Sequence, residues 1–316
     1  MRGPVSWAVA VRKPDQEIAV EAHSVPGPGK QWLKWPFFRG TYVLVEQMKI
    51  GIKALMISAN YQMEEEERPS EKQLGWTLGV AMVFFAGVFI LLPALFSKLG
   101  LRMFGFASPL TENLVEGAVR IGFLVGYVSL ISLIPDIRRV FQYHGAEHKT
   151  IYAYENDDPL EPEIVDKYTT LHVRCGTNFL FIVAFLTIFG HLILDVALAD
   201  YSLTVRLSSR VLAIPLLAGI AYEVIKAASR KEHSLVFRIA SLPGLALQKI
   251  TTRPPTRDQI EVAIKAMEAV IAREKLAVPD RQAAAERAVI DQAAERAEPE
   301  GETTGAEPGV EPVPPT

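Results

Sequence analysis

The run QLGWTLGVAMVFFAGVFILLPALFS, residues 73–97, lies between Lys72 and Lys98 and contains no charged side chain. Leu, Val, Phe and Ala dominate it. A helix needs about 20 apolar residues to cross the hydrocarbon core of a bilayer. We therefore predict a transmembrane helix here, in a mainly α-helical membrane protein.

Three further apolar runs are candidates for transmembrane helices: 113–135, 175–195 and 211–228. Glu116 and Arg120 lie near the start of the first of them, four residues apart, and Glu223 interrupts the last. Ionisable side chains inside a membrane helix are functional candidates by default. Glu116 also fits a capping arrangement near the membrane surface, and Glu223 could either snorkel to water or add a carboxylate to a metal site.

The charges of the connecting segments predict the orientation. Four spans place both termini on one side of the membrane. Segments 54–73, 136–174 and 229–253 carry 12 Lys and Arg residues, against 4 in the two remaining loops. Because positive charge collects on the cytoplasmic side, we expect the termini and the 136–174 loop in the cytoplasm and the protein in the cell membrane.

Shorter patterns on either side of these runs predict local elements. Residues 5–25 are rich in β-favouring side chains on both sides of a turn at Pro14 and Asp15, which predicts a β-hairpin. Residues 36–60 predict an amphipathic helix, lying either in the membrane interface or against the protein's own soluble part. Thr256 and Gln259 fit a capping box at the start of a C-terminal helix.

The predicted fold is thus a membrane bundle of about four helices with an N-terminal hairpin and cytoplasmic helices. Its segments are a hairpin at 1–30, an amphipathic helix and acidic linker at 31–73, the bundle at 74–230, a cytoplasmic helical region at 231–277 and a disordered acidic tail at 278–316.

Composition excludes some classes of function. The net charge is −3, which gives no basic surface for nucleic acid, so the expected partner is the lipid bilayer. Cys175 is the only cysteine, which rules out an intrachain disulfide. The chain contains neither a phosphate-binding loop nor a dinucleotide fingerprint, which argues against nucleotide-driven chemistry.

The string His144-Gly145-Ala146-Glu147-His148 follows Pro135-Asp136, a typical helix start. It fits the H-x-x-E-H pattern, in which two imidazoles one helical turn apart bind a metal ion and the glutamate acts as a general base. Such a pattern alone is weak, because a histidine on an apolar helix face is often a core residue.

His172 and Cys175 form a second cluster in the same loop. Imidazole and thiolate ligands suit zinc, so the predicted metal ligands are His144, His148 and His172 or Cys175, with Glu147 as the base. Glu155 or Glu223 could add a carboxylate. Alternatively, a lone buried cysteine is most often an inert small hydrophobic residue.

Two functions remain open: a metal-dependent enzyme of the hydrolase type, and a non-catalytic membrane scaffold or assembly factor with a structural metal or hydrogen-bonded histidine cluster. The extra glutamate favours the enzyme, since a purely structural site has no need of a base. A transporter is disfavoured, because paired broken helices are not evident.

Several strings resemble those of the YqhQ-like bacterial integral membrane proteins, the domain of unknown function 1385. They are Pro36-Phe37-Phe38-Arg39-Gly40, Phe141 to Lys149, Leu171 to Gly176, Pro243 to Gln248, and Thr251-Thr252. The resemblance covers roughly residues 1–273. It implies an integral membrane protein of a family described as predicted metal-dependent enzymes, and it implies no substrate.

Overall fold

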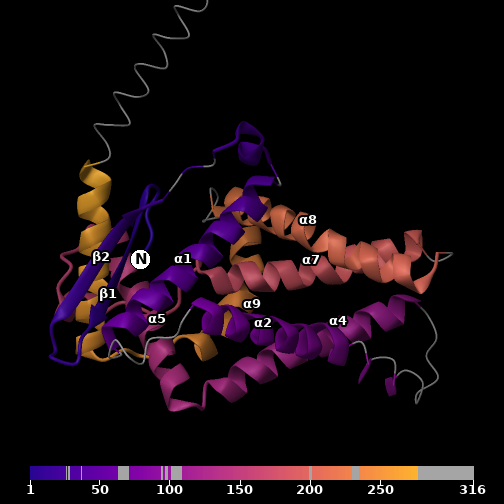
Figure 1. Cartoon of the computed structure of the whole chain (residues 1–316), viewed down its shortest axis with the longest axis horizontal. Helices are drawn as coiled ribbons and strands as arrows, with labels where there is room; N and C mark the ends of the chain where they lie inside the picture. The colour runs from indigo at the N-terminus through magenta and orange to yellow at the C-terminus, as the bar shows by residue number, and fades with distance from the viewer. Residues whose placement is uncertain are drawn as a thin grey trace, which may run out of the picture.

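The computed structural model is mainly helical, with one two-stranded sheet near the N-terminus (Figure 1). It describes residues 1–276 except 26, 28, 37, 63–70, 94, 97–98, 101–108, 199–200 and 230–234. The acidic tail predicted at 278–316 lies outside the described residues, as does most of the acidic linker.

The predicted hairpin is confirmed. Strands β1 (Ser6–Arg12) and β2 (Ile18–Ser24) pair antiparallel, with Ser6 opposite Ser24. The turn closes through a 2.8 Å hydrogen bond from the Lys13 amide to the Glu17 carbonyl. A short 3₁₀ helix, η1 (Gln31–Lys34), follows before the first long helix.

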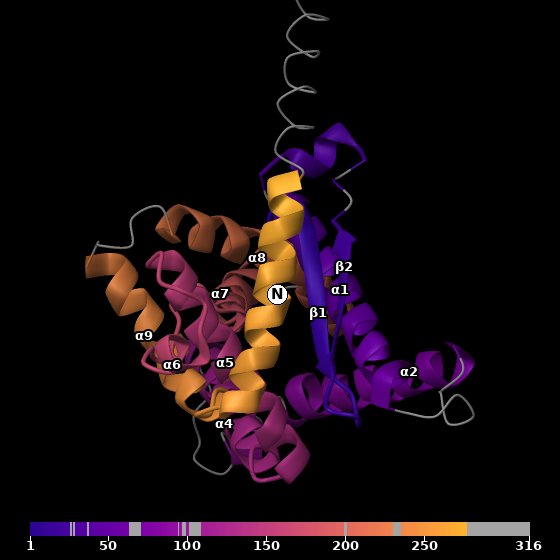
Figure 2. The same cartoon turned by 90° about the vertical axis from the view of Figure 1, so that its left-hand side faces the viewer.

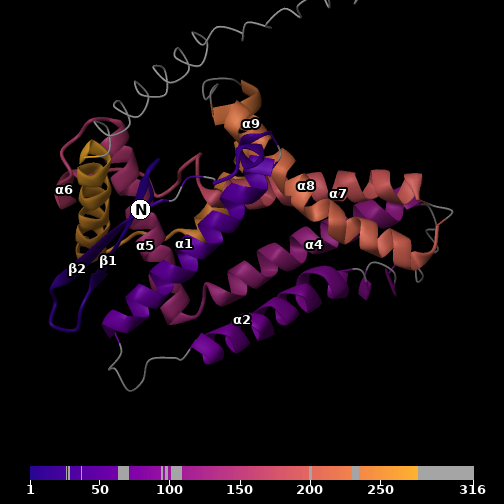
Figure 3. The same ribbon diagram turned by 45° about the horizontal axis from the view of Figure 1, so that its top comes forward.

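Four helices extend side by side away from the hairpin (Figures 1 and 3). They are α2 (Glu71–Ala86) with its π-helical continuation η3 (Gly87–Leu91), α4 (Pro109–Ile131), α7 (Gly176–Ala197) and α8 (Leu203–Ser229). Within the described residues, three segments are long and apolar enough to cross a membrane: Leu114–Ile131, Gly176–Leu194 and Ser208–Lys226. The chain therefore has the marks of a membrane protein.

The first predicted span, 73–97, is described only in part, since residues 94 and 97–98 lie outside the described residues. Its described apolar helix covers Gly75–Phe89, which is shorter than the other three. The chain is helical from α2 into η3, over residues 71–91, and changes to a π-helix at Gly87. Within the described residues three candidate spans are clear, and the fourth stays a prediction.

The outer surfaces of these helices carry large apolar side chains exposed in the isolated chain. Examples are Trp76, Val83, Leu130, Ile193, Val196 and Leu212. A soluble monomer rarely exposes so continuous an apolar surface. Lipid contact accounts for it, because hydrocarbon tails solvate such side chains as well as a protein core does.

A second layer packs at one end of the bundle (Figure 2). It contains α5 (Pro135–Glu155), the short α6 (Pro162–Val165), the hairpin and a helix over residues 257–276. Its core consists of Ala146, Ala153, Val165, Ile260, Ala263 and Ile264. The predicted capping contact is present, since the Thr256 amide donates to Gln259 Oε1 at 2.9 Å.

The hairpin is attached to the helix over 257–276 by polar contacts. One carboxylate oxygen of Glu274 accepts bonds from the Val5 amide, the Ser6 amide and the Ser6 hydroxyl. Arg12 forms a 2.8 Å ion pair with Glu261. These contacts fix the hairpin beside α5, where it forms one wall of a cavity described below.

Two helices connect the layers. The predicted amphipathic helix is present as α1 (Phe38–Gln62), and it packs on α8. There Arg39 forms a two-pronged ion pair with Glu223, one arm being 2.6 Å long. Glu116 likewise pairs with Arg120, at 2.7 Å. Helix α9 (Leu235–Thr251) packs on α7 and leads to the helix over 257–276.

Candidate metal centre

Helix α5 presents two imidazoles toward the junction of the layers. Pro135 occupies its first turn, where a missing amide proton costs nothing. His144 and His148 lie one turn apart on one face, with ring centroids 4.4 Å apart. His148 is buried and His144 is partly buried. The helical period therefore places them as the sequence predicted.

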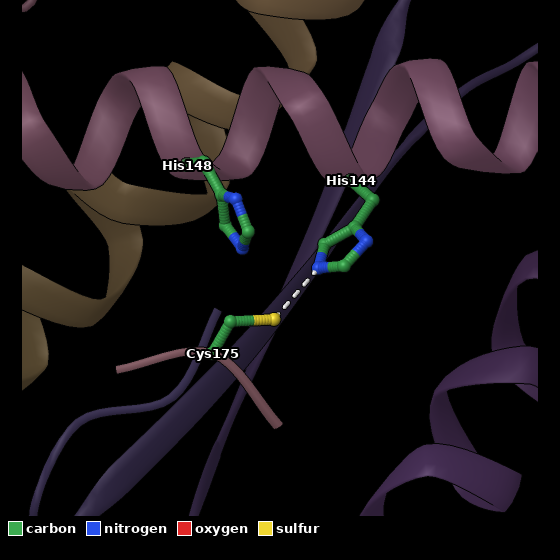
Figure 4. Close-up of side chains that lie close together, drawn as sticks. All are labelled: His144, His148 and Cys175. Atoms are coloured by element: carbon green, nitrogen blue, oxygen red, sulfur yellow. Dashed lines mark hydrogen bonds between the residues drawn. The ribbon is translucent and has the colours of Figure 1, made fainter. Parts of the chain in front are cut away.

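Cys175 comes to the same point from the bundle. It is the N-cap of α7 and has an extended backbone, with φ −74° and ψ 148°. Its Sγ atom lies 3.3 Å from His144 Nε2 (Figure 4). Among the described residues, His144, His148 and Cys175 form the group whose ligand atoms all lie within 4.8 Å of one another.

The orientation of both rings suits metal binding. His144 Nδ1 lies 2.9 Å from the Thr251 carbonyl and His148 Nδ1 lies 2.5 Å from the Thr170 carbonyl. A carbonyl only accepts, so each Nδ1 carries a proton and donates it. In neutral rings each Nε2 then has its lone pair available as a ligand, the arrangement that metal-binding histidines commonly show.

The spacing of the donor atoms also fits a zinc ion. Tetrahedral zinc with bonds of about 2.0–2.3 Å places neighbouring ligand atoms roughly 3.3–3.6 Å apart. The distance of 3.3 Å from Sγ to His144 Nε2 is of this size. This pair of donor atoms fits a zinc site, and the other donor atoms of the group lie no more than 4.8 Å apart.

Glu147 lies beside this group without belonging to it. Its carboxylate is 3.5 Å from the amino group of Met1, and its side chain is 45% exposed. It also lines a cavity that His144 borders. The position keeps Glu147 outside the set of converging donors but on the face of α5 that a substrate could reach.

His172 is placed differently from the other two histidines. Its Nδ1 accepts the Arg174 amide at 3.2 Å, and its Nε2 lies 3.4 Å from the Glu155 carboxylate. Both ring nitrogens thus have partners other than a metal. The ring lies 5.6 Å from that of His148, centroid to centroid. His172 is a neighbour of the donor group, and Glu155 accompanies it there.

Helix α9 supports the site through contacts that sequence reasoning did not anticipate. The buried Gln248 side chain holds the His172 backbone twice, accepting its amide at 2.7 Å and donating to its carbonyl at 2.8 Å. Thr251 supplies the carbonyl for His144. The sequence strings at 243–248 and 251–252 could have indicated this role of α9, since they resemble strings of the same family as the histidine motif does.

Gly145 allows the chain after α9 to approach α5. A Cβ atom at this position would lie 2.2 Å from the Arg253 carbonyl oxygen. The Arg253 amide in turn donates to the Phe141 carbonyl at 2.9 Å. The missing side chain therefore brings residues 251–253 close enough to bond His144.

The cluster changes the acidity of its members. Burial alone would raise the pKa of the Cys175 thiol, but hydrogen bonds from His144 and His148 and the charge of His144 lower it to about 5. Burial opposes protonation of His144, yet the bond and charge of Cys175, the bond with the Thr251 carbonyl and the charge of Glu147 together outweigh it and raise the pKa of His144. Burial lowers the pKa of His172 against the opposing effect of Glu155.

The low pKa predicts an unusual reactivity of Cys175. In protein stripped of metal by a chelator, we expect alkylation by iodoacetamide with a midpoint near pH 5, followed by mass spectrometry. His144→Ala should move the midpoint several units upward, because it removes a hydrogen bond to the thiolate. Added zinc should slow alkylation of the wild type. A wild-type midpoint between about 8 and 9, that of an ordinary thiol, would contradict the geometry.

The chain has helices long and apolar enough to cross a membrane, and a His/Cys cluster lies at one end of their bundle. These two features define the class of the protein: a helical membrane protein with a candidate metal centre. The chain belongs to the family of proteins of unknown function DUF1385, whose model matches residues 35–273. It is 31% identical over 258 residues to "Uncharacterized protein YqhQ" of Bacillus subtilis (strain 168), covering 77% of this chain and 79% of that protein. No solved structure matches. The family resemblance is confirmed.

Proposed function

We propose that this protein is a membrane-bound metal-dependent hydrolase whose zinc ion is held by His144, His148 and Cys175. One observation carries the proposal: three donor atoms from two helices converge within 4.8 Å, and both imidazoles have Nδ1 bound to a backbone carbonyl. Buried histidines that serve only packing have no reason to direct both Nε2 atoms to one thiol.

Three protein ligands leave the fourth tetrahedral position for water or substrate, as in catalytic zinc sites. Zinc supplies Lewis acidity, which polarises a carbonyl or phosphoryl group and makes water a better nucleophile. The low pKa of Cys175 favours the thiolate form that a metal ligand needs.

Glu147 is proposed as the general base. It follows the pattern of a glutamate adjacent to a ligand on the same helix, and it faces the cavity. Its carboxylate would take the proton from the attacking water and return it to the leaving group. His172 is proposed as a positioning residue, because its bonds with Glu155, Arg174 and Gln248 fix the turn that carries Cys175.

The proposed location is the cell membrane, with the layer containing α5 on the cytoplasmic side. The excess of Lys and Arg in the segments on that side of the bundle supports this orientation. Helices α2, α4, α7 and α8 lie side by side in Figure 3. If all four cross the membrane, the segments before α2 and after α8 lie on the same side of it.

Metal content tests the proposal. We expect about one zinc per chain in purified wild type and less than a tenth of that in His144→Ala, His148→Ala and Cys175→Ala, measured by atomic emission. His23→Ala, a histidine stacked on Trp7 in the hairpin, is the matched control and should keep its metal. A folded wild type without metal would overturn the proposal.

Glu147→Gln separates catalysis from metal binding. The variant should keep its zinc and lose hydrolysis of chromogenic carboxylic or phosphoric esters by about a hundredfold or more, the usual contribution of a general base. Glu163→Gln, an exposed carboxylate of α6, should retain activity. Equal turnover by Glu147→Gln and wild type would exclude Glu147 as the base.

The alternative is a scaffold with a structural metal. One observation favours it: the donors come from α5 and from the start of α7, so an ion there would fasten the outer layer to the bundle. Under this alternative, chelation would lower the melting temperature strongly and Glu147→Gln would change nothing. Zinc-dependent hydrolysis of the ester substrates would exclude the scaffold alternative and support the hydrolase.

A further inference from the structure

We infer that the cavity beside His144 and Glu147 binds the hydrocarbon chain of an anionic lipid. The assignment of this lipid as a substrate rests on the hydrolase function proposed above.

The cavity has a volume of about 1030 Å³ and lies between β1, α1, α5 and the helix over 257–276. Each of these elements contributes apolar side chains to it: Trp7 and Val9 from β1, Ile50 and Leu55 from α1, Val140 and Ile151 from α5, and Val262 and Met267 from the last helix. Pockets for drug-sized ligands have volumes of roughly 300–1,000 Å³ and are mostly apolar. A long flexible chain fits this space and lining.

The cavity wall begins on α5 a short way along the chain from α4. The candidate span ends at Ile131, and α5 begins at Pro135. Leu133 in this connection is 74% exposed, and Val140 in the cavity wall is 58% exposed. These exposed apolar side chains lie along the chain between the candidate span and the cavity, and a lipid chain entering from the bilayer would follow them.

A cation lies at this entrance. Arg139 lines the cavity one residue before Val140 and is exposed. Within the described part of the chain it makes no ion pair, whereas the lining residues Arg2 and Arg12 are paired with Glu46 and Glu261. A guanidinium close to the membrane surface binds carboxylate or phosphate well, which selects an anionic head group.

His144 and Glu147 stand in the wall of the same cavity. A lipid whose chain fills the cavity would therefore place its ester group beside His144, one of the three proposed ligands, and beside Glu147. In hydrolysis, the hydroxyl of water would join the carbonyl carbon or phosphorus. The bond from that atom to the leaving oxygen would break, and the leaving oxygen would receive the proton carried by Glu147.

Photolabelling of the full chain in detergent tests the inference. The probe is palmitic acid with a diazirine in its chain, and labelled peptides are mapped by mass spectrometry. We expect saturable labelling, competed by excess oleate, within 47–62, 139–151 and 257–270. Gly51→Leu should fill part of the cavity and weaken labelling about tenfold, which corresponds to about 1.4 kcal/mol of lost binding free energy.

Gly126→Leu is the matched control. At both positions a new Cβ would meet no atom within 4 Å, so neither change strains the fold, but Gly126 is on α4 outside the cavity. Arg139→Gln should weaken labelling by the acid while leaving labelling by the corresponding fatty alcohol unchanged, because only the acid needs a cation.

Zinc is measured in the same samples, so that the two proposals can fail separately. Equal labelling of Gly51→Leu and Gly126→Leu, or labelling confined to the outer faces of the bundle, would overturn the inference even with zinc bound. Cavity labelling of a protein that binds no zinc would support the lipid site and overturn the hydrolase.

Discussion

Gly145→Ala is expected to destabilise the protein and to abolish metal binding, although alanine is the better helix former. Alanine gains about 1 kcal/mol of helix propensity at an interior position. Against this, its Cβ would lie 2.2 Å from the Arg253 carbonyl oxygen, which belongs to backbone and cannot rotate away. Overpacking costs about 1–3 kcal/mol or more, so the clash outweighs the gain.

The clash acts on the site through one bond. Moving residues 251–253 away from α5 separates the Thr251 carbonyl from His144 Nδ1, now 2.9 Å apart. Loss of such a supporting bond usually lowers metal affinity by 10–100-fold, so zinc should be lost on dialysis. The measurements are the melting temperature and zinc content in detergent.

Gly51→Ala is the control for Gly145→Ala. It makes the same substitution in the middle of α1, where a new Cβ would meet nothing within 4 Å. It should leave zinc unchanged and keep or slightly raise the melting temperature. A Gly145→Ala protein with normal zinc and stability would show that residues 251–253 do not need this close approach.

Gln248→Met is expected to have the second large effect. Methionine has nearly the same shape, but it leaves the buried amide and carbonyl of His172 without the bonds of 2.7 and 2.8 Å that Gln248 provides. Each unsatisfied buried group costs about 1–3 kcal/mol. We expect a total near 3 kcal/mol, together with weaker zinc binding, because the turn from His172 to Cys175 would lose its anchor.

Gln62→Met separates this effect from the loss of any glutamine. Gln62 is exposed at the end of α1 and bonds the Arg12 carbonyl, so its replacement should change stability by no more than about 0.5 kcal/mol. Melting and zinc titration of both variants check the prediction. Normal zinc affinity in Gln248→Met would mean that Cys175 is held by the start of α7 alone.

Local patterns predicted the elements well, since their causes are local. The β-favouring side chains on both sides of the turn at Pro14 and Asp15 predicted the hairpin, and the pair Thr256 and Gln259 predicted the start of the last helix. Apolar runs gave α4, α7 and α8. The expected span at 73–97 is helical over its described part, and hydrophobicity did not reveal that this helix changes to a π-helix at Gly87.

Charged residues were harder to place. By sequence alone, Glu223 could either snorkel to water or add a carboxylate to a metal site. The structure instead pairs it with Arg39, from a helix that lies far away in the chain. His172 was grouped with Cys175 because of their spacing, but its two ring nitrogens face Arg174 and Glu155. Spacing indicates proximity; the direction of a ring depends on all its neighbours.

The sequence by itself determined the apolar helices, the placement of His144 and His148 one turn apart, and the family, because hydrophobicity, helical period and ordered strings are properties of the chain. Only the tertiary structure decided that Cys175 meets the two histidines and that α9 supports them. The reason is physical: the Thr251 carbonyl that orients His144 is a backbone group that every residue possesses. Its role arises from packing across Gly145, which leaves no mark in local composition.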